Sequence, residues 1–287
     1  MVLSTTLKRY YLLTKPGIIR GNVLIAAAGY FFGAAGNPQW LTLFGLVIGS
    51  SLIIASACVY NNILDRDIDK HMDRTKKRAL VEKTISVSNA VFFGTILLVL
   101  AIFVLLLTTN ILALTIALIG HVSYVIIYTF GKRLTVHGTL LGTISGATPP
   151  VIGYVAATGA LDLTALLLFL LLVAWQMPHF YSIALFRFDD YKNAKIPVLP
   201  VIKGYDRTRK EIIAYILLFF ILCVLLGLYG GASLFTVLLL LLASGYWVYL
   251  SLFPYTDVTR WAQRQFGWSL SVLLLLSATL SLDHFWS

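Results

Sequence analysis

The sequence has 287 residues, of which 59% are hydrophobic and only 12% are charged, and its formal net charge is +10. This composition is too apolar for a soluble globular domain. The basic residues lie in a few polar segments between apolar runs, so the positive charge indicates membrane orientation and attraction of anions, not nucleic-acid binding. The sequence therefore predicts an integral membrane protein.

The N-terminal residues 1–16 contain no apolar core followed by a small-residue cleavage site. They also lack the Arg- and Ser-rich amphipathic pattern of a mitochondrial transit peptide. We therefore expect no cleaved leader, and a bacterial inner membrane is favoured over a mitochondrial one.

Nine apolar runs follow, most of them close to the ~20 residues that cross a hydrocarbon core. They cover residues 18–36, 41–61, 88–108, 111–130, 138–158, 163–186, 211–230, 232–253 and 266–284. Segments of this length satisfy their backbone hydrogen bonds in lipid only as helices. We predict an all-α, polytopic bundle of nine transmembrane helices, forming one domain over residues 1–287.

The Lys and Arg residues set the predicted orientation. All 22 lie in the N-terminal arm or between spans two and three, four and five, six and seven, and eight and nine. With nine spans these segments share one face, which the positive-inside rule makes cytoplasmic. The N-terminus and the two long polar loops, about 62–87 and 187–210, are therefore expected in the cytoplasm, with the C-terminus on the far side.

The most polar segment at the end of a span is residues 61–69, Asn-Asn-Ile-Leu-Asp-Arg-Asp-Ile-Asp. If the second helix continues through it, Asn62, Asp65 and Asp69 lie at i, i+3 and i+7 on one narrow face. Ionisable groups at a membrane boundary are costly and indicate a functional site. Mg²⁺ prefers one or two carboxylates plus substrate phosphates. The segment therefore predicts an intramembrane enzyme that acts on a diphosphate.

Spacing by four extends this pattern from Asn61 through Asp65 and Asp69 to Asp73, and a basic run, residues 74–78, follows it. Acidic groups on adjacent turns repel one another unless a cation lies among them. The basic run can bind phosphate oxygens that a metal leaves exposed. The alternative is a solvated amphipathic helix whose carboxylates pair with the neighbouring Arg and Lys residues. Asp67 projects to the other side of this helix.

The second long loop supplies a weaker candidate half-site. Asp189 and Asn193 are four residues apart, with Asp190 beside them and Lys195 following. The alternative is a helix end before a turn bounded by Pro197.

Several motifs carry a resemblance to a known family. Asn61, Asp65 and Asp69 form an NxxxDxxxD run followed by Met72-x-Arg74-Thr75-x-x-Arg78, which resembles the first motif of the UbiA-type intramembrane prenyltransferases. Four further segments are similar to the haem-farnesylating branch of that superfamily, namely residues 14–19 (TKPGII), 146–154 (GATPPVIGY), 175–180 (WQMPHF) and 190–200. An amide at Asn62 and the lack of a second DxxxD run depart from the wider superfamily but are typical of this branch. The resemblance spans roughly residues 10–270.

The resemblance implies transfer of the farnesyl group of farnesyl diphosphate to a vinyl group of haem b, giving haem O and diphosphate. It implies catalytic residues Asn62, Asp65, Asp69 and Asp190. It also implies Mg²⁺ on Asp65 and Asp69, with a second ion on Asp190 and Asp189 or Asn193. The expected diphosphate-binding residues are Arg74, Arg78, Lys132, Arg133 and Lys195. The expected partners are the two substrates, the lipid bilayer and, by contact, a haem A synthase or terminal oxidase.

His179 is the candidate haem ligand, because an imidazole among Trp175, Phe180 and Tyr181 can ligate iron. The alternative is a buried histidine hydrogen-bonded to a neighbouring helix. Two other functions stay open at this point. One is prenylation of an aromatic quinone precursor, and the other is a transporter or assembly factor whose loops bind anions.

Overall fold

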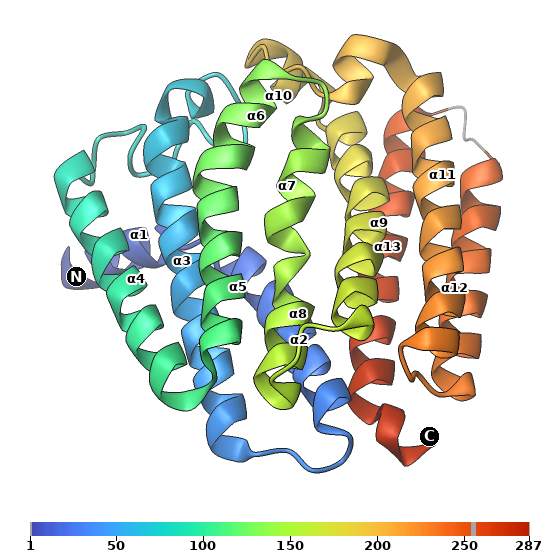
Figure 1. Cartoon of the computed structure of the whole chain (residues 1–287). Helices are drawn as coiled ribbons and strands as arrows, with labels where there is room; N and C mark the ends of the chain where they lie inside the picture. The colour runs from blue at the N-terminus through green and yellow to red at the C-terminus, as the bar shows by residue number, and fades with distance from the viewer. Residues whose placement is uncertain (1, 254–256, 287) are drawn as a thin grey trace.

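The structure is a computed structural model that describes residues 2–253 and 257–286. Within these residues, nine helical segments are long and apolar enough to cross a membrane, so the chain is a multi-pass membrane protein (Figure 1). Six of the nine are α2 (Pro16–Ala34), α3 (Trp40–Asp69), α4 (Val87–Thr108), α9 (Leu163–Phe186), α11 (Leu199–Tyr229) and α12 (Leu234–Leu252). The predicted all-α bundle is confirmed.

The remaining three spans are composite. The fourth span joins α5 (Ile111–Val122), the π-helix η1 (Ser123–Tyr128) and α6 (Thr129–Leu134). The fifth joins α7 (Gly138–Gly146) and α8 (Thr148–Thr158), and the ninth is α13 (Val258–Leu282) with the short η2 (Asp283–Phe285). Two short helices, α1 (Val2–Leu13) and α10 (Phe188–Asn193), lie outside the spans.

Side-chain caps start several of the spans after tight turns. The Asn110 side chain accepts a hydrogen bond from the Ala113 amide at 2.9 Å at the start of α5, and Asp162 accepts from Ala165 at 3.0 Å at the start of α9. Each cap satisfies one of the amide groups that a helix N-terminus leaves without an intrahelical partner. Polar residues between apolar runs therefore define where these helices begin.

The break between α7 and α8 lets the fifth span pack tightly against α2. Pro149 and Pro150 lie in the first turn of α8, where proline is tolerated. A Cβ atom at Gly29 of α2 would overlap the Pro150 backbone, and one at Gly153 would overlap the Ala26 backbone. The glycines are therefore needed for the close approach of these two helices.

Two predicted boundaries were wrong. Residues 199–210, expected in a loop, form the first turns of α11, and Gly204 (φ 76°) accommodates the kink in this helix. The spacing by four does not reach Asp73, because α3 ends at Asp69. The Asp73 side chain is exposed and pairs with Lys76 at 2.5 Å.

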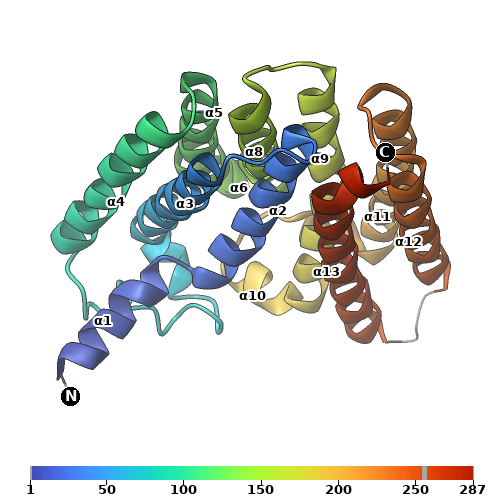
Figure 2. The same cartoon turned by 90° about the horizontal axis from the view of Figure 1, so that it is seen from below.

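The two long loops meet at one end of the bundle, at the top of Figure 1, whereas the C-terminal end of α13 lies at the opposite end. Met72 of the first loop packs with Ala194 and Ile196 of the second in a small buried cluster. The view in Figure 2 shows α1 projecting from the side of the bundle formed by α3 and α4. The residues of the two long polar loops are therefore gathered at one end of the molecule.

Candidate active site

A cavity of about 860 Å³ lies among the spans and is covered by the two loops. Its walls come from α2, α3, the α5–η1–α6 span, α7, α8, α9 and α13. Its apolar lining includes Ile25, Ile53, Ile54, Ala117, Ile152, Leu172, Ile183, Leu270 and Leu273. The described lining also includes five basic and two acidic side chains, which gives it a net charge of +3: Lys15, Arg74, Arg78, Lys132, Arg187, Asp65 and Asp69. The cavity thus combines an apolar body with a cationic mouth.

The cavity face of α3 carries Asn61, Asp65 and Asp69, which are at most 3% exposed. These residues are spaced by four, so they follow one side of the helix. Asn62 is not among the cavity-lining residues; its side-chain amide donates to the Leu13 carbonyl at 2.8 Å. The structure therefore brings Asn61, and not Asn62, together with the two carboxylates.

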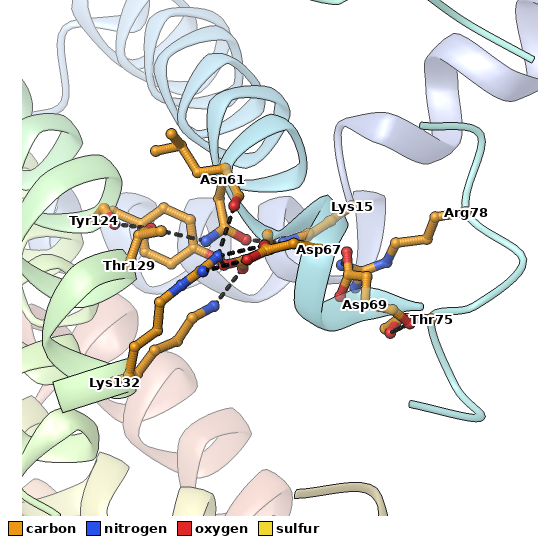
Figure 3. A network of polar contacts seen from close by, with 12 residues as sticks. Lys15, Asn61, Asp67, Asp69, Thr75, Arg78, Tyr124, Thr129 and Lys132 are labelled. Atoms are coloured by element: carbon orange, nitrogen blue, oxygen red, sulfur yellow. Dashed lines mark hydrogen bonds and ion pairs between the residues drawn. The ribbon is translucent and has the colours of Figure 1, made fainter. Parts of the chain in front are cut away.

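Both cavity carboxylates are paired with basic side chains (Figure 3). The Lys132 ammonium group forms an ion pair with Asp65, and Arg78 Nη1 lies 2.7 Å from Asp69 Oδ2. The Thr75 hydroxyl donates to the Asp69 carbonyl at 2.9 Å and so fixes the loop that carries Arg78. Cations at this position also favourably face the negative end of the α3 dipole.

Arg133 contacts the C-terminal end of α3 but does not line the cavity. Its guanidinium lies 2.7 Å from Asp67 Oδ2 and 3.3 Å from Asp65 Oδ1, and it donates to the Leu64 carbonyl at 2.6 Å. The Asp67 side chain is 57% exposed, on the side of the helix away from the cavity. The two Nη atoms of Arg133 are therefore hydrogen-bonded to α3, whereas its buried Nε has no hydrogen-bond partner in the described part of the chain.

Lys15 is a cavity residue that the site prediction missed. Its backbone is left-handed (φ 52°) at the junction of α1 and α2, a strained conformation for a residue with a side chain. Lys15 Nζ donates to Asn61 Oδ1 at 2.5 Å, and Asn61 Nδ2 donates to Thr129 Oγ1 at 2.9 Å. Burial lowers the pKa of Lys15 to about 8. No described carboxylate forms an ion pair with Lys15, so its charge is available to an anion.

The π-helix η1 presents two tyrosines to the cavity. The rings of Tyr124 and Tyr128 stack with centroids 5.4 Å apart. Lys15 Nζ lies 6.0 Å from the centre of the Tyr124 ring, and Lys132 Nζ lies 5.1 Å from that of Tyr128. π-Helical turns frequently occur at functional sites. These ring faces can stabilise positive charge inside the cavity.

The second loop contributes less to the cavity than the sequence predicts. Asp190 is buried, and its carboxylate accepts a hydrogen bond from the Asp73 amide at 2.8 Å, but it does not line the cavity. Asp189, Asn193 and Lys195 are exposed and likewise lie outside the lining. The structure therefore does not bring these four residues together with Asp65 and Asp69.

His179 lines the cavity between aromatic rings. Its ring centroid lies 4.9 Å from those of Trp175 and Phe266. The Ser269 hydroxyl donates its only proton to the Phe266 carbonyl at 2.6 Å, so the 2.7 Å contact between His179 Nδ1 and Ser269 Oγ requires a proton on Nδ1. A neutral His179 therefore keeps the lone pair of Nε2 for a ligand.

The donor set at the mouth fits a magnesium ion that is shared with a substrate. Asp65 and Asp69 offer hard carboxylate oxygens, and Mg²⁺ in proteins commonly uses one or two carboxylates together with substrate phosphates. No group of three or more His, Cys, Asp or Glu side chains suited to a metal occurs in the described part of the chain. Residues 65 and 69 thus fit a site that a diphosphate would complete, not a site made by protein ligands alone.

Comparison with known proteins agrees with this geometry. The UbiA prenyltransferase family model matches residues 22–270. The chain is 44% identical to the protoheme IX farnesyltransferase of Acinetobacter baylyi, with 97% of this chain and 96% of that protein covered. It is also 44% identical to the enzyme of the same name from Pseudomonas savastanoi pv. phaseolicola, covering 97% of this chain and 95% of that protein.

Two solved structures share the fold. A digeranylgeranylglyceryl phosphate synthase superposes with a TM-score of 0.78 at 18% identity, covering 97% of this chain and 98% of the other. A UbiA homologue from Archaeoglobus fulgidus, bound to GPP and Mg²⁺, superposes with a TM-score of 0.72 at 17% identity over 95% of this chain and 99% of that one. The chain belongs to the UbiA prenyltransferase family.

Proposed function

We propose that this protein is a protohaem IX farnesyltransferase, which transfers the farnesyl group of farnesyl diphosphate to a vinyl group of haem b and yields haem O and diphosphate. The observation that carries the proposal is the single cavity that joins a cationic mouth with two buried carboxylates to an apolar body containing His179. The relatives of the same name cover nearly the whole chain.

The diphosphate binds at the mouth of the cavity in this proposal. Lys15, Lys132, Arg78 and Arg74 supply positive charge and charge-assisted hydrogen bonds to its oxygens. Asp65 and Asp69 hold Mg²⁺, which supplies charge stabilisation for the departing diphosphate when it is bound. The prenyl chain lies in the apolar body, where water is excluded from the allylic cation that forms.

The acceptor haem binds with its iron facing His179. Histidines that ligate metals usually donate their second ring N–H to an oxygen, as His179 does to Ser269. The bond from C1 of the farnesyl group to the diphosphate oxygen breaks, and the vinyl group then attacks C1 of the allylic cation. Water then adds to the carbon next to the porphyrin ring and releases a proton. Tyr124 and Tyr128 face the charge that develops during these steps.

The membrane is the bacterial inner membrane, with the N-terminus and both active-site loops in the cytoplasm and the C-terminus on the far side. This orientation rests on the distribution of Lys and Arg. A haem A synthase or a terminal oxidase in contact with this protein would receive the hydrophobic product.

A competition assay tests the acceptor. The purified protein in lipid is given labelled farnesyl diphosphate, Mg²⁺, haem b and an aromatic quinone precursor at equal concentrations. We expect the labelled farnesyl group to be transferred from the diphosphate to haem. Label on the aromatic ring would support the second UbiA-type function, and intact farnesyl diphosphate with folded protein would contradict the enzymatic function.

A further inference from the structure

The carboxylates that fit Mg²⁺ already have cationic partners that line the same cavity. Lys132 is paired with Asp65 and Arg78 with Asp69, and the four side chains are between 4% and 23% exposed. Both cationic side chains belong to the cavity lining, so each can also reach a ligand held there. Arg133, the second cation on Asp65, is instead fixed by Asp67 and the Leu64 carbonyl.

A bare divalent cation meets two obstacles at this mouth. The lining has a net charge of +3, which repels a metal ion and attracts a diphosphate. The metal must also displace Lys132 or Arg78 from a buried carboxylate, and the displaced cation would be left in the cavity without a partner. A buried charge that loses its partner is costly.

A diphosphate removes both obstacles together. Its oxygens offer new partners to Lys132 and Arg78, and its negative charge offsets the positive lining. Each carboxylate that releases a cation can then accept a metal ion, so no charged group is left alone.

We propose that Lys132 and Arg78 are exchangeable counter-ions that hold Asp65 and Asp69 until a diphosphate arrives, so that the metal binds tightly only together with the diphosphate. This inference rests on the proposed function, and it assigns these two cations a positioning role toward the metal. It makes metal and diphosphate binding mutually dependent, with a coupling of about 10-fold or more.

The test measures binding without turnover. Mn²⁺ serves as the paramagnetic probe, and its affinity for the full-length protein in nanodiscs is read from the free Mn²⁺ signal in electron paramagnetic resonance. No diphosphate or haem is present. Binding of labelled farnesyl diphosphate is measured separately without metal.

Lys132→Met is the main variant, and we expect opposite changes in the two affinities. The affinity for Mn²⁺ alone rises about 10-fold because Asp65 is released from Lys132, while the affinity for farnesyl diphosphate falls. Arg78→Met is the second variant, on the other carboxylate, and should behave in the same way. Thermal unfolding confirms that each variant is folded.

Lys15→Met is the matched control, because Lys15 lines the cavity but is hydrogen-bonded to an amide and not to a carboxylate. It should weaken farnesyl diphosphate binding but change the Mn²⁺ affinity by less than about threefold. If Lys15→Met raises the Mn²⁺ affinity as much as Lys132→Met does, the increase comes from the lower positive charge of the cavity in general. That result would overturn the proposed exchange. Unchanged Mn²⁺ affinity in both Lys132→Met and Arg78→Met would also overturn it.

The outcome is separable from the proposed function. If the protein farnesylates haem but binds Mn²⁺ tightly in the absence of diphosphate, the proposed function stands and the proposed exchange of counter-ions is wrong. A folded protein that does not bind farnesyl diphosphate in the metal-free assay loses the proposed site as a whole.

Discussion

His179 donates its Nδ1 proton to Ser269 Oγ across 2.7 Å, and this contact joins α9 to α13 at the cavity wall. The hydrogen bond orients the imidazole and leaves Nε2 as its acceptor nitrogen. The contact explains how a residue on one helix can depend on a serine 90 positions away. It matches the alternative of a histidine hydrogen-bonded to a neighbouring helix, and the ligand function of Nε2 stays a prediction.

Removal of this hydrogen bond should weaken haem binding. We expect Ser269→Ala to lower haem affinity by about 10-fold or more, the scale found when a partner of a ligating histidine is lost. His179→Ala should lower it further and leave farnesyl diphosphate affinity nearly unchanged. Separate titrations, by haem absorbance and by binding of labelled farnesyl diphosphate, measure the two effects. Ser277→Ala, a buried serine elsewhere on α13, is the control. Equal loss of both substrates in His179→Ala would contradict the assignment.

Loss of either cavity carboxylate should abolish turnover. Asp65→Asn or Asp69→Asn keeps the side-chain shape but removes the charge that Mg²⁺ requires, so we expect kcat to fall by about 100-fold or more. Membrane insertion should be unchanged. The matched control is Asp67→Asn, because Asp67 lies on the same helix but faces away from the cavity. Wild-type turnover in either cavity variant would contradict the assignment of Mg²⁺ to Asp65 and Asp69.

The fold followed from hydropathy because each apolar run needs a helix in lipid, and nine such runs were visible in the sequence. The helix period also placed Asp65 and Asp69 on one face. The choice between Asn61 and Asn62 depended on how α3 is rotated toward its neighbours, which packing decides. The sequence supported both residues, because the NxxxDxxxD run begins at Asn61 and the i, i+3, i+7 spacing begins at Asn62.

Lys15 was missed for a related reason. It lies 46 residues from Asn61 in the sequence, and it reaches the cavity through a left-handed backbone conformation. The only local signal was its place in the TKPGII segment before the first span. Assignment of Asp189, Asn193 and Lys195 to the site stays a prediction, since these residues are exposed outside the cavity lining.

Lys15 gives the reaction a predicted pH dependence. Its pKa is lowered to about 8, so the ammonium form is present below this pH and is lost as the pH rises through it. Because the charged form binds the diphosphate, kcat/KM for farnesyl diphosphate at saturating haem should fall above about pH 8. Lys15→Met should have a lower kcat/KM without this step, and Lys15→Arg should stay active to higher pH. A step of unchanged size in Lys15→Met would assign the titration to another group.

Substitutions of Asp190 can distinguish a role in holding the two loops together from the predicted role in metal binding. Its carboxylate accepts a hydrogen bond from the Asp73 amide and so joins the two long loops. Asp190→Asn keeps an acceptor oxygen, whereas Asp190→Ala removes it. If the role is to hold the loops together, we expect Asp190→Asn to retain most activity and Asp190→Ala to lose about 10-fold, with faster proteolysis of the loops. Equal, complete loss in both variants would support the predicted metal-binding role.

The most direct test of the account is a single-turnover reaction of the purified protein with haem b, farnesyl diphosphate and Mg²⁺ in isotopically labelled water, followed by mass analysis of the extracted haem. The account predicts a mass gain equal to one farnesyl group plus one hydroxyl group, with the label in the hydroxyl oxygen. The gain should be absent in Asp65→Asn. Haem of unchanged mass, recovered from folded wild-type protein that has consumed its farnesyl diphosphate, would contradict the proposed acceptor.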